Sequence, residues 1–135
     1  MHIIKKIQSI KKPNSTISSN SIINLQQQLA INKKGSLPED FVKFLYFYNG
    51  INYNGGVICG IYNHGNLQDI STINAQIKHP LHKDLSFIGY DDFDYLAYNQ
   101  KYKVYQIIDK LDLEVLEEYS DFSSAAQHIL KINDE

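Results

Sequence analysis

The sequence predicts an α+β fold: a single domain with a mostly antiparallel or mixed β-sheet packed against N-terminal and C-terminal helices. Apolar residues recur at helical spacing over 22–31, 37–49 and 122–132. Strand-like apolar runs lie between these segments, at 57–62, 85–90, 95–98, 101–108 and 113–119. Helices and strands that are segregated along the chain favour α+β, whereas a Rossmann-like parallel sheet requires regular alternation of the two.

Length and composition are those of one globular domain. The chain has 135 residues, of which 43% are apolar and 21% charged. It contains no apolar run of the roughly 20 residues that a membrane span requires, and its first residues do not predict a secretory signal. The single Cys59 excludes an internal disulfide. We expect residues 1–20 to form an N-terminal arm or short helix, and residues 21–135 to form the domain.

The clearest local signal precedes the second helix. Ser36 and Glu39 have the spacing of a capping box, with Ser36 as N-cap, and Pro38 is tolerated in the first turn. Asn49-Gly50 then supplies the left-handed residue that ends a helix. Capping residues also precede two other predicted helices: Asn20 or Ser21 before 22–31, and Ser120 or Asp121 before 122–132. We expect a further helix over 70–78, with Ser71 or Thr72 near its start.

Turn residues separate the predicted strands. Residues 53–56 and 91–94 are rich in Asn, Gly and Asp, which favour tight turns. Strands joined by such short turns predict an antiparallel meander. Within the predicted strand 57–62, Gly60 marks a bulge or a close approach of another backbone segment.

Charge is unevenly distributed along the chain. Residues 1–50 carry seven lysines and two acids, a balance of +5, whereas residues 51–135 carry six lysines and thirteen acids, a balance of −7. All thirteen basic residues are lysines, which either argues against the bidentate recognition of phosphate or guanine that arginine provides or reflects an AT-rich genome, since Ile, Lys and Asn are all abundant. Because the acidic C-terminal half repels nucleic acid, we expect no nucleic-acid partner. An acidic C-terminal half attracts a basic partner or simply forms a solvated face.

Candidates for catalysis or metal binding are few, and no phosphate loop, nucleophile elbow or zinc helix occurs in the sequence. His79 and His82 lie three residues apart and would need further ligands, of which His64 and Asp84 are conceivable. The proline between them suits a surface turn instead.

Two further pairs of residues have a possible chemical role. Cys59 could pair with His64 or His128 as a nucleophile, but its apolar surroundings are typical of an inert core thiol. Asp92 and Asp94 have a spacing that can bind a divalent cation with substrate phosphates, and the same residues favour a hairpin turn.

A resemblance to a known superfamily begins in the 37–50 helix. Leu-Pro at 37–38, an aromatic at 41, Phe-Leu at 44–45 and Asn-Gly at 49–50 resemble the signature of the SUKH superfamily, which includes fungal cell-wall assembly regulators and bacterial toxin-immunity proteins. Strand-like segments at 85–90, 94–98 and 104–107 and the closing segment 120–130 follow in the order typical of that superfamily. A single glycine follows Asn49, where many members have two.

The resemblance implies a non-enzymatic fold without cofactor or metal. It implies an immunity protein that binds and neutralises a cognate bacterial toxin domain, such as a nuclease, in the cytoplasm by occluding its active site. The alternative is a regulatory or scaffold module of the same fold. Because nucleases that bind phosphates are basic, we expect the partner to contact the acidic residues of the C-terminal half and the aromatics among them, without membrane involvement. The predicted contact residues are Tyr90, Asp91, Asp92, Phe93, Asp94, Asp109, Asp112, Glu114, Glu117 and Glu118, with Tyr95 as a further aromatic anchor.

Overall fold

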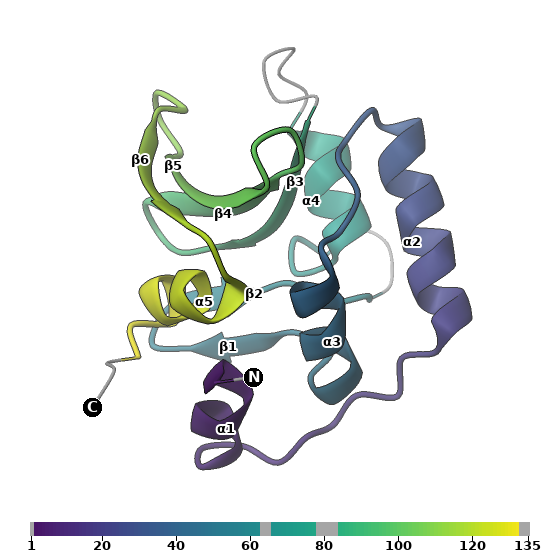
Figure 1. The fold of residues 1–135 in the computed structure, drawn as a ribbon, viewed down its shortest axis with the longest axis vertical. Coiled ribbons are helices and arrows are strands. Elements are labelled where there is room, and N and C mark those ends of the chain that lie inside the picture. Colours follow the sequence, from purple (N-terminus) through teal and green to yellow (C-terminus); the bar gives the residue numbers. More distant parts are fainter. Residues whose placement is uncertain (1, 63–65, 78–83, 133–135) are drawn as a thin grey trace.

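The computed structural model describes residues 2–62, 66–77 and 84–132, in which five helices accompany one six-stranded sheet (Figure 1). The helices are α1 (His2–Gln8), α2 (Ser19–Ile31), α3 (Glu39–Phe47), α4 (Ile70–Gln76) and α5 (Phe122–Leu130). The strands are β1 (Ile51–Tyr53), β2 (Gly56–Ile58), β3 (Leu85–Tyr90), β4 (Asp94–Asn99), β5 (Val104–Asp109) and β6 (Val115–Tyr119).

The sheet is an antiparallel meander. Its strands lie in chain order from β1 to β6, and each pairs with its neighbour in antiparallel register. The helix α4 is inserted between β2 and β3, and helices from both ends of the chain pack on the sheet (Figure 1). The predicted α+β fold is therefore confirmed, and its sheet is antiparallel rather than mixed.

Aromatic rings join α3 and α5 to the sheet. The ring of Phe122 lies 5.2 Å from Phe41, 5.0 Å from Phe44 and 5.8 Å from Tyr105, and all four side chains are buried. Burial of a large apolar side chain stabilises a fold by about 1.5–3 kcal/mol. This cluster therefore fixes the layer of helices against β5.

The N-terminal helix belongs to the same core. Ile3, Ile4 and Ile7 of α1 are buried, and the Ile3 N–H donates to Ser123 Oγ of α5 at 3.2 Å. Ile10, which lies beyond the end of α1 at Gln8, is exposed.

Two of the predicted helix starts are wrong. The helix predicted over 37–49 is α3, which begins at Glu39; its N-cap is Pro38, and Ser36 does not cap it. Instead the Ser36 N–H donates to Gln100 Oε1 at 3.1 Å, which ties this segment to the β4–β5 turn. The N-cap of α2 is Ser18, so this helix begins at Ser19, before the predicted 22. The predicted start of α4 at Ile70 is confirmed, and its N-cap is Asp69.

The predicted strand over 57–62 is also too long. It ends at Ile58 because the chain leaves the sheet toward Gly60, whose predicted close backbone approach is confirmed: an added Cβ would lie 2.6 Å from the Asn49 carbonyl. The short strand β1 was not predicted. It pairs with β2 across a turn in which Asn54 and Gly55 have φ angles of 53° and 80°, as a tight hairpin requires. None of the helices in the described ranges is long and apolar enough to cross a membrane.

Candidate functional site

Two neighbouring hairpin tips carry most of the predicted contact residues. The β3–β4 turn contains Asp91, Asp92 and Phe93, and the β5–β6 turn runs from Lys110 to Glu114. The tips lie at the same end of the sheet because Asp94 of β4 is directly opposite Asp109 of β5. The Lys110 N–H also donates to the Phe93 carbonyl at 3.0 Å. We call residues 90–94 and 109–114 together the hairpin-tip surface.

The acids of the β3–β4 tip stabilise its turn. Asp91 Oδ1 accepts from the N–H groups of Phe93 at 3.0 Å and Asp94 at 2.8 Å, and the Asp91 N–H donates to the Asp94 carbonyl at 2.9 Å. An aspartate that bonds its own turn in this way is favoured for conformational reasons alone. The structure therefore presents Phe93 on a preformed turn.

The β5–β6 tip is built in the same way. Asp109 Oδ1 accepts from the N–H groups of Leu111 at 2.7 Å and Asp112 at 3.2 Å, and Asp112 Oδ1 accepts from Glu114 N–H at 3.0 Å. Leu113 adopts a left-handed φ of 61° and packs against the core. These bonds hold Leu111 at the outermost point of the turn.

The tips display two apolar side chains among charges. Phe93 is 78% exposed and Leu111 is 96% exposed. Scattered apolar residues on a surface need no explanation, but these two lie on neighbouring turns that are each held by their own hydrogen bonds. Leu111 was not predicted from the sequence; the available signal is an isolated leucine within a turn that otherwise contains Asp and Lys.

The hairpin-tip surface is acidic, although two lysines contact it. It contains six carboxylates, and with Lys110 and the neighbouring Lys131 its net charge is −4. Lys131 Nζ lies 3.5 Å from Asp91 Oδ2. Lys110 Nζ lies over the rings of Tyr90, at 5.0 Å, and Tyr95, at 5.4 Å, so these two rings are covered by a cation.

Two carboxyls at this end of the sheet have shifted pKa values in opposite directions. Burial and the nearby charges of Asp91 and Asp109 raise the pKa of Asp94. Burial alone would raise the pKa of Asp91, but the hydrogen bonds from Phe93 and Asp94 and the charge of Lys131 outweigh it and lower the pKa. The negative charge concentrated at the tips therefore disfavours the ionised form of Asp94.

Glu117 and Glu118 lie away from the tips, along β6. Glu117 Oε2 accepts from the Tyr119 hydroxyl and lies 3.3 Å from His128 Nδ1 on α5. Glu118 Oε2 accepts from Gln106 Nε2 at 2.7 Å. The structure therefore separates these two glutamates from the other predicted contact residues.

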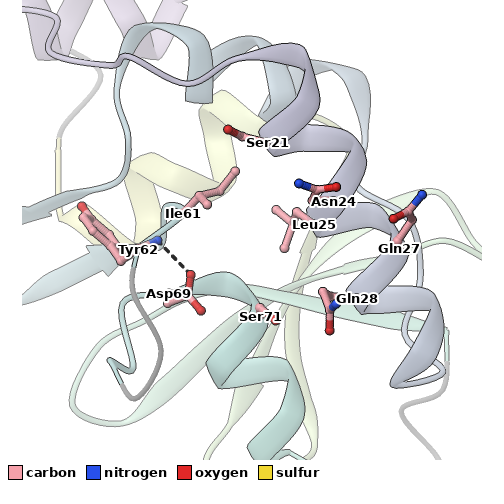
Figure 2. A pocket seen from close by; sticks show the side chains of 9 residues that line it. All are labelled: Ser21, Asn24, Leu25, Gln27, Gln28, Ile61, Tyr62, Asp69 and Ser71. Carbon is pink, nitrogen blue, oxygen red and sulfur yellow. Dashed lines mark hydrogen bonds between the residues drawn. The ribbon is translucent and has the colours of Figure 1, made fainter.

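A pocket of about 380 Å³ lies between α2 and the segment that leads into α4 (Figure 2). Asn24, Gln27 and Gln28 line it from α2, and Asp69 lines it from the opposite side. Asp69 is committed to local structure, since it accepts from the N–H groups of Tyr62 at 2.9 Å and of Thr72 at 3.0 Å. The lining offers neutral amides for hydrogen bonding, and we assign no reaction to it.

The candidates for catalysis do not form a site in the described ranges. Burial raises the pKa of the fully buried Cys59 thiol, which leaves it protonated and inert. His128 bonds the Tyr119 hydroxyl at 2.8 Å instead of pairing with Cys59. His64, His79 and His82 lie outside the described residues. Among those described, no three His, Cys, Asp or Glu side chains gather in a way that could hold a metal ion.

No family model matches the chain. No curated protein matches it significantly.

Proposed function

We propose that this chain is an immunity protein that binds a cognate toxin domain in the cytoplasm and neutralises it by covering its active site. The resemblance to the SUKH superfamily supplies the class of function. The hairpin-tip surface supplies a contact site that suits it. The observation that carries the proposal is the exposure of Phe93 and Leu111 on two preformed, acidic turns.

The geometry fits recognition of a basic protein. Interface energy is concentrated in a few apolar anchors surrounded by polar groups, and Phe93 and Leu111 have that arrangement. The net negative charge around them accelerates association with a positively charged groove. Because the turns are held by their own hydrogen bonds, little conformational entropy is lost when they are covered.

A growth-rescue assay tests this function. The protein encoded by the gene next to that of this chain, which we call the adjacent gene, is produced in a sensitive host, with and without this chain. We expect growth to stop without the chain and to resume with it. Growth arrest that this chain fails to relieve, or an adjacent product without toxicity, argues for the regulatory or scaffold module instead.

Charge reversal tests the site. Asp92→Lys and Glu114→Lys, made one at a time, each reverse the charge of one exposed side chain of the tips. We expect slower association with the toxin domain, most clearly at low salt, where charges are least screened. Glu39→Lys, on the exposed start of α3, makes the same change of charge as each of these variants and is the matched control; equal effects at the tips and at Glu39 would place the contact elsewhere.

A further inference from the structure

The strand β6 is the last strand of the sheet, and among the described residues nothing pairs with its outer edge (Figure 1). Such an edge offers a row of backbone N–H and C=O groups to an incoming strand. The opposite edge of the sheet, β1, has only three residues, whereas β6 has five. The β6 edge is thus the longer of the two.

This edge carries two glutamates and a bulge, but it lacks the two residues that most clearly blunt an edge strand. Natural edge strands are protected by charged side chains, bulges or covering elements, and in particular by lysine or proline. The sequence of β6, Val-Leu-Glu-Glu-Tyr, contains neither residue, and Val115 and Leu116 are 48% and 51% exposed. A register shift between Ile107 and Ile108 leaves Leu116 unpaired with β5, so a bulge interrupts the ladder at one point only.

Charge selects the kind of strand that fits. Glu117 lies on the face of the sheet toward α5, where it accepts from Tyr119 of its own strand and lies 3.3 Å from His128 of α5. Glu118 lies on the other face, where it accepts from Gln106 of β5. An added strand therefore meets a carboxylate on each face. Opposite charges on neighbouring strands stabilise a pair and like charges destabilise it. Pairing with β6 of a second copy of this chain would bring Glu114, Glu117 and Glu118 of both molecules together at the interface. Repulsion between these like charges disfavours self-pairing.

We propose that an extended, lysine- or arginine-containing segment of the protein partner adds to β6 as a seventh strand. This inference rests on the proposed function and names how the partner is held. Because β6 begins directly after Glu114, the edge is continuous with the hairpin-tip surface. Backbone hydrogen bonds would supply affinity, and contacts with Glu117 and Glu118 would supply specificity.

The first test uses a synthetic peptide, Lys-Val-Lys-Val-Lys-Val-Lys, added to the full isotope-labelled chain. We expect NMR shift changes and slower amide exchange in residues 115–119, and no change at 51–53 in β1. Two peptides serve as controls: one with glutamate in place of lysine, and one with proline in place of the central valine, which cannot form the ladder. Binding of the proline peptide equal to that of the parent would overturn strand addition.

Variants separate the possible outcomes. Leu116→Lys places on the edge the charge that natural edges use, and its fold is checked by thermal unfolding. We expect it to abolish the exchange protection and to weaken binding of the toxin domain about tenfold or more.

Shift changes confined to 90–94 and 109–114, or a dimer that Leu116→Lys dissociates, would overturn the inference. If Leu116→Lys binds normally while Phe93→Ala with Leu111→Ala does not, strand addition is wrong and the proposed function stands. If the chain also fails to rescue growth, the proposed function fails.

Discussion

The Tyr105 hydroxyl of β5 donates a hydrogen bond to the Asp40 carboxylate of α3. The second oxygen of Asp40 accepts from the Phe122 N–H at 2.9 Å, at the start of α5. One carboxylate thus joins the sheet to two helices that are far apart in the sequence. The aromatic cluster around Phe122 packs beside it, so these bonds set the position of α5 against β5.

Removal of this carboxylate should destabilise the fold. Asp40→Ala leaves the buried Tyr105 hydroxyl and the Phe122 N–H without their acceptor, and each unsatisfied group costs about 1–3 kcal/mol. Chemical denaturation should show a lower free energy of unfolding. Asp121→Ala is the comparison, because it removes the N-cap of the same helix α5 and should cost about 1 kcal/mol. Equal losses would mean that Asp40 acts only as a helix cap.

Tyr105 should make stability fall in alkaline solution. Burial, followed by the hydrogen bond to Asp40, raises the pKa of Tyr105 in the folded chain. The unfolded tyrosine loses its proton above about pH 10, so the folded state is disfavoured progressively above that value, by about 1.4 kcal/mol per pH unit. Below pH 10 this contribution is fully present. Unfolding free energies from pH 8 to 11 should decline less steeply for Tyr105→Phe than for the natural chain. Tyr102→Phe, at an exposed position, should leave the slope unchanged.

Neutralisation of Asp94 should stabilise the fold near neutral pH. Its pKa is raised in the folded chain, so the protonated carboxyl favours the folded state. This stabilising contribution is present at low pH and is lost as pH rises through the folded pKa. Asp94→Asn keeps the site neutral and should raise Tm by about 1–3 °C at pH 7. The difference from the natural chain should vanish near pH 3. A larger gain at pH 3 than at pH 7 would contradict this assignment.

Cys59 should be chemically silent in the folded protein. Its side chain is fully buried, burial raises its thiol pKa, and its Sγ lies 3.7 Å from the Leu67 carbonyl. A thiol reagent should fail to modify the native chain over hours and should modify one thiol per chain in denaturant. Rapid modification of the native chain would restore Cys59 as a candidate nucleophile.

The sequence predicted the meander from local signals, because the β3–β4 and β4–β5 turns are short and the strands beside them are strongly apolar. Prediction failed where distant contacts decide the conformation. Ser36 has the sequence of an N-cap, yet its N–H is taken by Gln100, 64 residues away. The strand β1 forms by pairing with β2. With only three residues, it is too short for alternating apolar and polar residues to identify a strand.

The candidate site could likewise be predicted only in part. From the sequence we expected the acids to form one charged region, and the register between Asp94 and Asp109 places most of them at one end of the sheet. We also expected Glu117 and Glu118 among them, although bonds to Tyr119 and Gln106 hold these two glutamates along β6. The exposure of Leu111 depends on the hydrogen bonds of its turn, which sequence spacing alone does not reveal.

The proposed function depends most directly on the binding of a protein partner to the hairpin-tip surface. The direct measurement is the Kd of the adjacent gene's product for three forms of this chain, by calorimetry. We predict that Phe93→Ala with Leu111→Ala raises the Kd about tenfold or more. Ile31→Ala with Tyr102→Ala, which removes two exposed apolar side chains elsewhere, should leave the Kd within about twofold of the natural value. An unchanged Kd for the hairpin-tip variant would contradict the proposal that this surface binds the partner.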